Sequence, residues 1–181
     1  MNAGKAQSER EASRRIILIF TFALYLLLLI YCTLLSAGFG RIATNGATSM
    51  TLAEYFKARG NLVPLRTIAN QTKALLRGFY PARHYVTNVI GNLAAFAPCA
   101  YFLPRLFPRC RKFPVFFAVT SLMVIAVETL QLFMRVGSFD VDDYILNMLG
   151  ASLFFLLLKF IQTTDNNKIE TENDNEKDNS L

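Results

Sequence analysis

The chain has 181 residues, of which 53% are hydrophobic and 18% charged, with three cysteines and a formal net charge of +6. This composition is too apolar for an ordinary water-soluble domain, and the length is too short for two large domains. The basic residues flank apolar segments, a pattern typical of topology signals and anionic-lipid contact and not of nucleic-acid binding. An odd number of cysteines, two of them within apolar runs, argues against a disulfide framework. We therefore predict one membrane domain.

The predicted fold class is all-α, a polytopic membrane protein with four transmembrane helices. The first apolar segment, Ile16–Ala37, contains no charged residue. It would form about 33 Å of helix, enough to cross a hydrocarbon core of about 30 Å. No small-residue cleavage site of the A-x-A type follows it, so we expect it to remain as an anchor. The other three predicted spans are His84–Leu103, Phe113–Met134 and Tyr144–Phe160.

Four spans put both termini on the same side of the membrane. Basic residues are concentrated in residues 1–15 and in the short loop Arg105–Lys112. The positive-inside rule therefore predicts a multi-pass protein of the cell (cytoplasmic) membrane with both termini in the cytoplasm, although seven basic residues in the long first loop complicate it. The tail 163–181 carries six acidic and two basic residues. We expect this tail to be disordered and to follow a membrane domain at residues 16–162.

The long first loop is predicted to contain two short helices. Thr51 and Glu54 have the spacing of a capping box, and Gly60 stands where such a helix would end. A second helix, with one apolar side, is expected from Thr67 to Arg77. Both helices could lie in the membrane interface, or they could simply pack over the bundle.

Polar residues recur on one face of each of the last three spans. Glu128 is the most informative, because an ionised side chain within a bilayer costs several kcal/mol and usually faces the protein interior. Helical spacing turns each polar face inward, and position along the helices places these groups in one half of the bilayer. We predict an outward-facing, ligand-binding cavity covered by the first loop. The predicted cavity residues are Asn88, Asn92, Glu128, Gln131, Arg135, Asp142, Asp143 and Asn147, and the predicted roof consists of Asn61, Pro64 and Arg66.

Each of these residues also has a purely structural interpretation. Glu128 could be neutralised by Arg135 or Arg66 and serve only to lock helix packing. The asparagines could simply hydrogen-bond between helices. For the acidic cluster Asp140–Asp143 we rank capping of the fourth span first, recognition of a polar ligand second and a hard cation third. No metal and no cofactor is therefore predicted.

Glycines and prolines of the spans have expected structural roles. Gly91 and Gly150 are expected to permit close contact between helices. Pro98, Pro104 and Pro114 are expected at a kink, at a helix end and in a first helical turn, respectively.

Four ordered motifs resemble the VanZ-like family of small membrane proteins. They are N-L-V-P-L at Asn61–Leu65, N-V-I-G-N-L-A-A-F-A-P at Asn88–Pro98, S-x6-E-x2-Q at Ser121–Gln131, and R-x4-D-x-D-D-x3-N-x2-G at Arg135–Gly150. The resemblance covers Ile16–Ile161 and departs from the family at Leu65, where Phe is usual, and after Pro98, where Phe-Gly is common. It implies a polytopic helical protein of the cell envelope. The family's named representative is associated with antibiotic resistance, to the lipid-bearing glycopeptide teicoplanin.

The leading functional hypothesis is a non-catalytic protein whose cavity recognises a lipid, a cell-wall precursor or a lipophilic glycopeptide. Membrane lipids would be its other partners, and its oligomeric state is left open. One alternative is an intramembrane enzyme acting on a lipid-linked substrate with Glu128 as general base. The chain has a single histidine, His84, and no G-x-S-x-G, H-E-x-x-H or Walker motif, which disfavours this alternative. A small-molecule transporter is disfavoured because the four spans show no inverted repeat.

Overall fold

The computed structural model describes residues 2–35 and 50–178, which are helical apart from short connections. Helix α1 (Asn2–Ile30) continues into one π-helical turn, η1 (Tyr31–Leu35). The remaining elements are α3 (Leu52–Arg59), α4 (Arg66–Leu76), α5 (Ala82–Ala95), α6 (Cys99–Leu106), the 3₁₀ turn η2 (Pro108–Arg111), α7 (Phe113–Phe133) and α8 (Val141–Asp178). The all-α prediction is confirmed.

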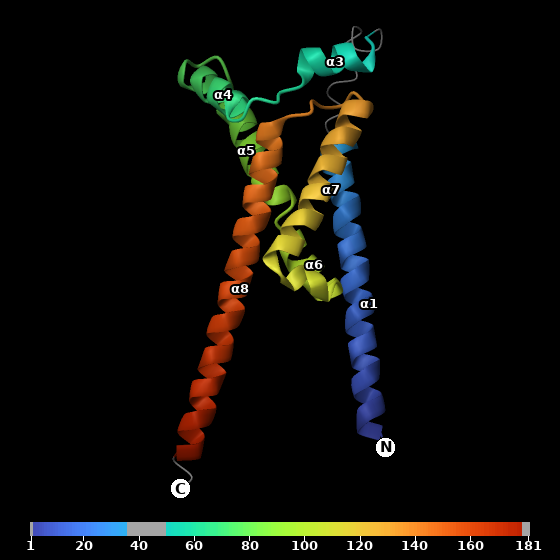
Figure 1. Cartoon of the computed structure of the whole chain (residues 1–181), viewed down its shortest axis with the longest axis vertical. Coiled ribbons are helices and arrows are strands. Elements are labelled where there is room, and N and C mark those ends of the chain that lie inside the picture. Colours follow the sequence, from blue (N-terminus) through green and yellow to red (C-terminus); the bar gives the residue numbers. More distant parts are fainter. Residues whose placement is uncertain (1, 36–49, 179–181) are drawn as a thin grey trace.

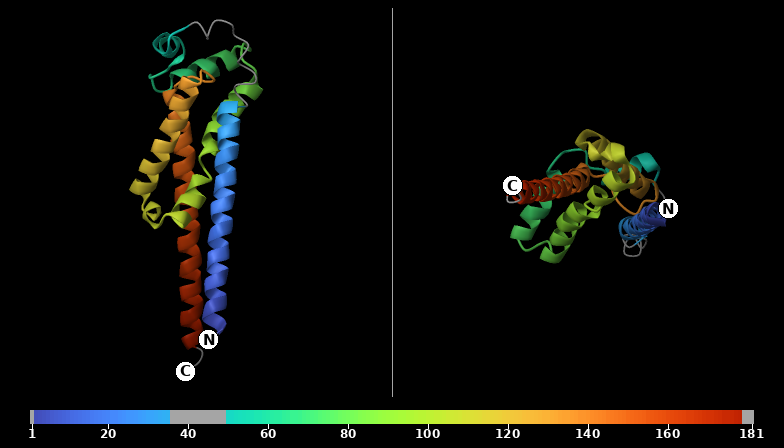
Figure 2. Two further views of the ribbon diagram at one scale, coloured as in Figure 1. Left: turned by 90° about the vertical axis from the view of Figure 1, so that its right-hand side faces the viewer. Right: turned by 90° about the horizontal axis from the view of Figure 1, so that it is seen from below.

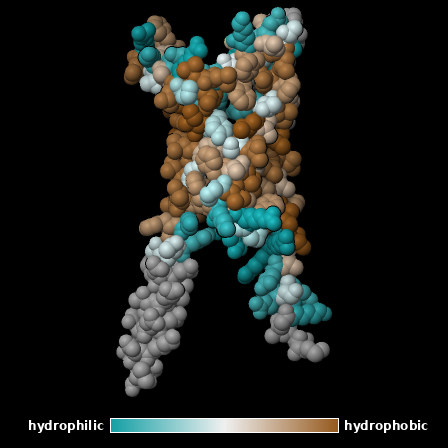
Figure 3. Space-filling model, in the orientation of Figure 1, coloured by the Kyte–Doolittle hydropathy of each residue, from teal (hydrophilic) through white to brown (hydrophobic). Residues whose placement is uncertain are grey.

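Four helical segments are long and apolar enough to cross a membrane: Gln7–Leu34, Ala82–Leu106, Phe113–Phe133 and Val141–Thr164. They match the four predicted spans, except that the end of the first predicted span, after Leu35, lies outside the described residues. Figure 3 shows an apolar band between two hydrophilic ends of the molecule. Both described chain ends lie on one side of this band, and α3 and α4 lie across the other side (Figure 1).

The second span is not one continuous helix. It breaks at Pro98 into α5 and α6, as expected for a kink, and α6 turns toward α1 (Figure 1). Pro104 was expected to end this span, but it lies inside α6, which continues to Leu106. The lost N–H and the ring of a proline disturb the turn before it, so two further residues can stay helical. Pro114 lies in the first turn of α7, as predicted.

The last helix is longer than its apolar segment. In the structure α8 continues from the fourth span through the acidic tail to Asp178, where the sequence analysis expected disorder after residue 163. A formed helix adds one backbone hydrogen bond for each residue that it fixes, so the span provides a nucleus for this extension. Residues 179–181 lie outside the described part of the chain.

Both short helices predicted in the first loop are present. Thr51 and Glu54 form the predicted capping box at the start of α3. The backbone N–H and hydroxyl of Thr51 both donate to the Glu54 carboxylate, at 2.7 and 2.9 Å, and hold the pKa of Glu54 below its ordinary value. Gly60 caps the other end of α3 with an extended backbone, φ −72°. Figure 2 shows this loop lying over one end of the long helices.

The core joins all four spans through apolar side chains. Phe116 of α7 stacks on Phe155 of α8 with ring centroids 4.5 Å apart. The hydroxyl of Tyr25 in α1 donates to the carbonyl of Ala95 in α5 at 2.6 Å, which fixes the first span against the second. The buried cluster comprises Leu29, Phe96, Cys99, Ala100, Leu103, Cys110, Phe116, Val124, Met148, Ala151 and Phe155.

The two glycines expected at helix contacts behave differently. A Cβ added to Gly150 would overlap the backbone carbonyl of Leu93, so Gly150 permits the close contact of α8 with α5. A Cβ added to Gly91 would meet nothing within 4 Å, so the expectation for Gly91 is wrong. Gly91 lies instead beside open space.

We predict opposite effects of alanine at these two glycines. Gly150→Ala should lower the free energy of unfolding by about 2 kcal/mol, because the helices must separate. Gly91→Ala should leave it unchanged or raise it by up to about 1 kcal/mol, because alanine favours the helix. Thermal unfolding of the two purified variants in the same detergent measures the difference. Equal stability of both variants would contradict the packing described for Gly150.

Candidate functional site

Asp142 joins the first loop to the start of α8. Its side chain is 0% exposed, and its carboxylate accepts hydrogen bonds from the backbone N–H groups of Leu65, Thr67 and Ile68 at 2.5, 2.7 and 3.0 Å. These groups lie at the first turn of α4, whose N-cap residue, Leu65, has no polar side chain. A carboxylate satisfies free N–H groups there and faces the positive end of the helix dipole. Asp142 therefore caps a helix remote in sequence.

Asp140 makes a second set of contacts with the same loop. Its carboxylate accepts from the Asn61 amide at 2.9 Å and from the Thr67 hydroxyl at 2.6 Å. It also accepts from the backbone N–H of Asp142 at 2.9 Å, so it caps its own helix. The backbone of Asn61 pairs with the segment around Asp140. The whole acidic cluster was expected to cap the fourth span. Asp140 does so, whereas Asp142 caps α4.

Glu128 lies directly behind this junction. It is 5% exposed, and the backbone N–H of Asp140 points to its Oε2 atom at 3.4 Å. Asp140 and Asp143 also lie close enough to Glu128 to interact with it electrostatically. Glu128 therefore faces the protein interior and not the lipid. Arg66, considered as a neutralising partner, is exposed on the loop.

A cavity of about 790 Å³ lies between α1, α5, the end of α7, the start of α8 and the covering helix α4. Polar and apolar side chains both line it, and we call it the polar cavity because polar side chains of several spans meet there. Four predicted site residues line it: Asn88, Asn92, Gln131 and Asp143. The Asn92 amide donates to Asp143 Oδ1 at 2.5 Å, joining the second span to the fourth. The Gln131 amide donates to the carbonyl of Thr33 at 2.9 Å, joining the third span to the first. Side chains from separate spans thus meet in one space.

Four other predicted cavity residues are not among those lining this space. Asp142 and Glu128 are held at the junction described above. Arg135 lies in the turn after α7, at φ 56°, and its carbonyl accepts from the Tyr55 hydroxyl at 3.1 Å. Asn147 is buried one helical turn below Asp143 and donates to its carbonyl at 2.8 Å. These four residues lie behind the lining residues and help to hold them in position.

The roof differs from the prediction in a similar way. Asn61 is buried and bound to Asp140, whereas Pro64 and Arg66 are exposed and do not line the cavity. The cover is provided by Thr67 and Gln71, four residues apart on one face of α4. The Asn88 amide donates to Gln71 Oε1 at 3.4 Å, from the second span to this cover.

Sequence reasoning missed several lining residues. His84 was considered only as the single histidine, which counts against catalysis, and it lies in the wall of the cavity. Spacing on one helical face could have found Thr67 with Gln71 and His84 with Asn88, because each pair is four residues apart. Other unpredicted polar lining residues are Tyr25, Thr33, Tyr80, Thr87, Ser138 and Asp140.

The described residues that line the cavity carry a net negative charge. They include Asp140 and Asp143, together with His84, and no Lys or Arg is present among the lining residues that the structure describes. Within residues 2–35 and 50–178, no three His, Cys, Asp or Glu side chains are grouped to hold a metal ion. None of the three cysteines forms a disulfide, and Cys32 lies in the cavity wall. The lining is suited to ligand groups that donate hydrogen bonds or carry positive charge.

The fold and this site define a four-span helical membrane protein with a polar cavity between its spans, covered by an amphipathic loop helix. The sequence matches the VanZ/LLP1 family over residues 22–162. The chain therefore belongs to this family, as the motifs predicted. Comparisons with curated proteins and with solved structures find no match.

The junction at Asp142 generates a testable prediction. Asp142→Asn should lower the free energy of unfolding by about 3 kcal/mol, because a charged acceptor of several backbone hydrogen bonds is lost in a buried site. Glu54→Gln, in the exposed capping box, should cost less than about 1 kcal/mol. Thermal unfolding measures both. Tryptic cleavage at Lys73 and Arg77 should also accelerate in Asp142→Asn only, and unchanged cleavage would argue against the capping role.

Proposed function

We propose that this VanZ-family membrane protein recognises the polar part of an amphiphilic ligand in its cavity at the outer surface of the cell membrane. The ligand is a lipid, a cell-wall precursor or a lipophilic glycopeptide of the teicoplanin type. The observation that carries the proposal is the meeting of Asn88, Asn92, Gln131 and Asp143, from three spans, in one cavity of about 790 Å³. Polar groups placed at membrane depth are costly, which favours a functional role for such a group.

The chemistry of the lining narrows the class of ligand. The carboxylate of Asp143 and the side-chain carbonyl oxygens of Asn88 and Asn92 accept hydrogen bonds, whereas the NH₂ groups of the two asparagines donate them. A ligand with amine, amide or hydroxyl groups can bind to both kinds of group. Ethanolamine headgroups, amino sugars and the peptide of a wall precursor all have these groups. A purely anionic ligand would face the carboxylate of Asp143 and is disfavoured.

The same proposal places both termini in the cytoplasm. Basic residues lie before the first span and in the loop that contains η2, at the end of the bundle opposite α3 and α4 (Figure 1). With these basic ends in the cytoplasm, the covered mouth of the cavity lies on the outer side. Ligands outside the cell would then reach the cavity without crossing the membrane.

We predict that labelling of intact cells follows this orientation. In a background with all three cysteines replaced by alanine, Asn70→Cys on α4 should react with a membrane-impermeant maleimide. Lys5→Cys, before the first span, should react only after the cells are lysed. Gel-shift labelling measures both, and the reverse pattern would place the cavity on the cytoplasmic side.

Recognition is preferred to catalysis because of where Glu128 lies. A general base must come within hydrogen-bonding distance of the substrate, directly or through one water. Glu128 is 5% exposed, lies behind Asp140 and is not among the lining residues. Transport by alternating access would require two arrangements of the spans. In the described residues, α4 covers one end of the cavity.

Susceptibility of cells provides the functional test. Cells lacking the protein are complemented with the parent, Asp143→Asn, Asn92→Leu or the control Asn70→Ala, which alters an exposed residue of α4. The first two variants should lose at least about tenfold in protection against teicoplanin, equivalent to about 1.4 kcal/mol of binding. Asn70→Ala should protect as well as the parent does.

Protection is compared between cells that contain equal amounts of the parent or variant protein in the membrane. Vancomycin, which shares the peptide target but lacks the acyl chain, is tested in parallel. Protection against teicoplanin alone would connect the cavity with the acylated ligand, and protection against both would indicate the wall precursor. Full teicoplanin protection by Asp143→Asn and Asn92→Leu would refute the role of the cavity in resistance.

A further inference from the structure

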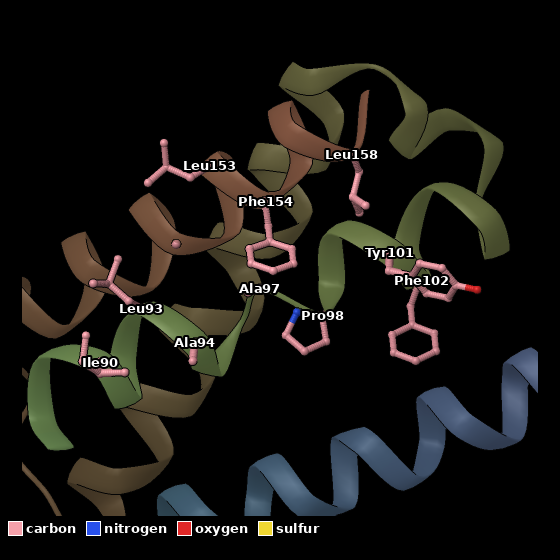
Figure 4. Close-up of a pocket in the computed structure, with 11 residues that line it drawn as sticks. Ile90, Leu93, Ala94, Ala97, Pro98, Tyr101, Phe102, Leu153, Phe154 and Leu158 are labelled. Atoms are coloured by element: carbon pink, nitrogen blue, oxygen red, sulfur yellow. The ribbon is translucent and has the colours of Figure 1, made fainter. Parts of the chain in front are cut away.

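An apolar groove of about 650 Å³ lies between the second and fourth spans, on a face of α5 next to the one that lines the polar cavity. Figure 4 shows Ile90, Leu93 and Ala94 on one wall, Leu153 and Leu158 on the other, and the Phe154 ring pointing toward Pro98. Aliphatic and aromatic side chains form its surface. The groove lies within the two spans, where lipid chains surround the protein.

The groove results from a close contact between the second and fourth spans, followed by a break in the second span. Gly150 brings α8 against the backbone of Leu93, which closes one end. Past this contact the second span breaks at Pro98, and α6 takes a different direction from α5, toward α1 (Figure 1). From Gly150 to Leu158 the open side of α8 extends for about 12 Å. At the α6 end, the Arg105 guanidinium lies 3.7 Å from the centroid of the Tyr101 ring.

The groove and the polar cavity share a low border. Ala94 and Pro98 line both spaces, and Gly91 beside them faces the cavity with open space where a Cβ would stand. The two spaces therefore adjoin at a border of small side chains. The two spaces together therefore have the amphiphilic character of a lipid, with a polar part next to an apolar part.

We propose that the groove holds an acyl chain of a membrane phospholipid whose headgroup lies in the polar cavity. This inference rests on the proposed function and assigns its ligand as a phospholipid with a headgroup that donates hydrogen bonds, such as phosphatidylethanolamine. A helix from a second copy of the chain could fill the apolar groove, but it would leave the adjoining polar cavity unexplained. The shared border at Ala94 and Pro98 favours one molecule that occupies both.

The two halves of the site have different energetic roles. An acyl chain that moves from the bilayer into the groove exchanges one apolar environment for another, so it gains packing and little hydrophobic free energy. Preference for one lipid must then come from Asn92, Asp143 and the other polar groups. The groove sets the direction in which the ligand lies.

Photocrosslinking of the full-length chain in phosphatidylethanolamine nanodiscs tests the proposal. One lipid probe carries a diazirine in the middle of an acyl chain, and a second probe carries it on the headgroup. The chain probe should crosslink mainly to groove residues such as Ala97, Leu153 and Phe154. The headgroup probe should crosslink to the cavity residues Gln71 and Asn88. Mass spectrometry of the digested protein locates both.

Substitution at the shared border provides the matched comparison. Ala94→Trp fills the crossing and should reduce crosslinking of the chain probe in the groove about fivefold or more, a loss of about 1 kcal/mol in binding. Leu122→Trp, at a residue of α7 that is 69% exposed, should not change it. Ala94→Leu serves as a milder second variant, and both Ala94 variants are compared at equal thermal stability with the parent.

Each outcome supports or overturns the proposal that a phospholipid occupies the groove and the cavity. Chain crosslinks spread evenly over exposed residues of α7 and α8, or unaffected by both Ala94 variants, would overturn the inference. The proposed function would survive that result if the headgroup probe still labelled Gln71 and Asn88. Absence of headgroup labelling there would overturn the assignment of a phospholipid to the cavity.

Discussion

The buried carboxylate of Asp142 is the constraint on which the site depends. It would be costly alone in a fully buried position, and the first turn of α4 would be costly with its N–H groups unpaired. Each satisfies the other, through bonds of 2.5 to 3.0 Å to three backbone groups. Asp140 and Asn61 extend this junction on its other side. The result is a loop helix fixed over one end of the spans, so that a polar space remains beneath it.

The polar groups beneath α4 are held mainly by contacts between different elements. Asn92 binds Asp143 across two spans, Gln131 binds a carbonyl of the first, and Asn88 reaches Gln71 on the cover. Such bonds position helices against one another where the bilayer supplies no hydrophobic driving force between them. The same bonds keep polar atoms along one cavity. Under the proposed function, the same side chains would combine the structural role with ligand recognition.

The second span connects this polar region with the lipid. Gly150 allows α5 and α8 to touch, and the break at Pro98 makes them separate again, so that an apolar groove opens beside the cavity. Ala94 and Pro98 border both spaces. A protein with few helices thus acquires adjoining polar and apolar spaces by interrupting one helix, without adding a further span.

The sequence alone determined the four spans, the two loop helices and the capping box at Thr51, because hydropathy and local spacing act within one segment. It also indicated that Glu128 faces inward, since exposure to lipid is costly. Only the tertiary structure decided that Asp142 caps α4, that Gly150 and not Gly91 lies at a helix contact, and that Asp140 separates Glu128 from the cavity. Helical periodicity gives the face on which a residue lies, but not the rotation and height at which two helices meet. Those two quantities, set by packing over the whole bundle, determine which polar residues line a shared space.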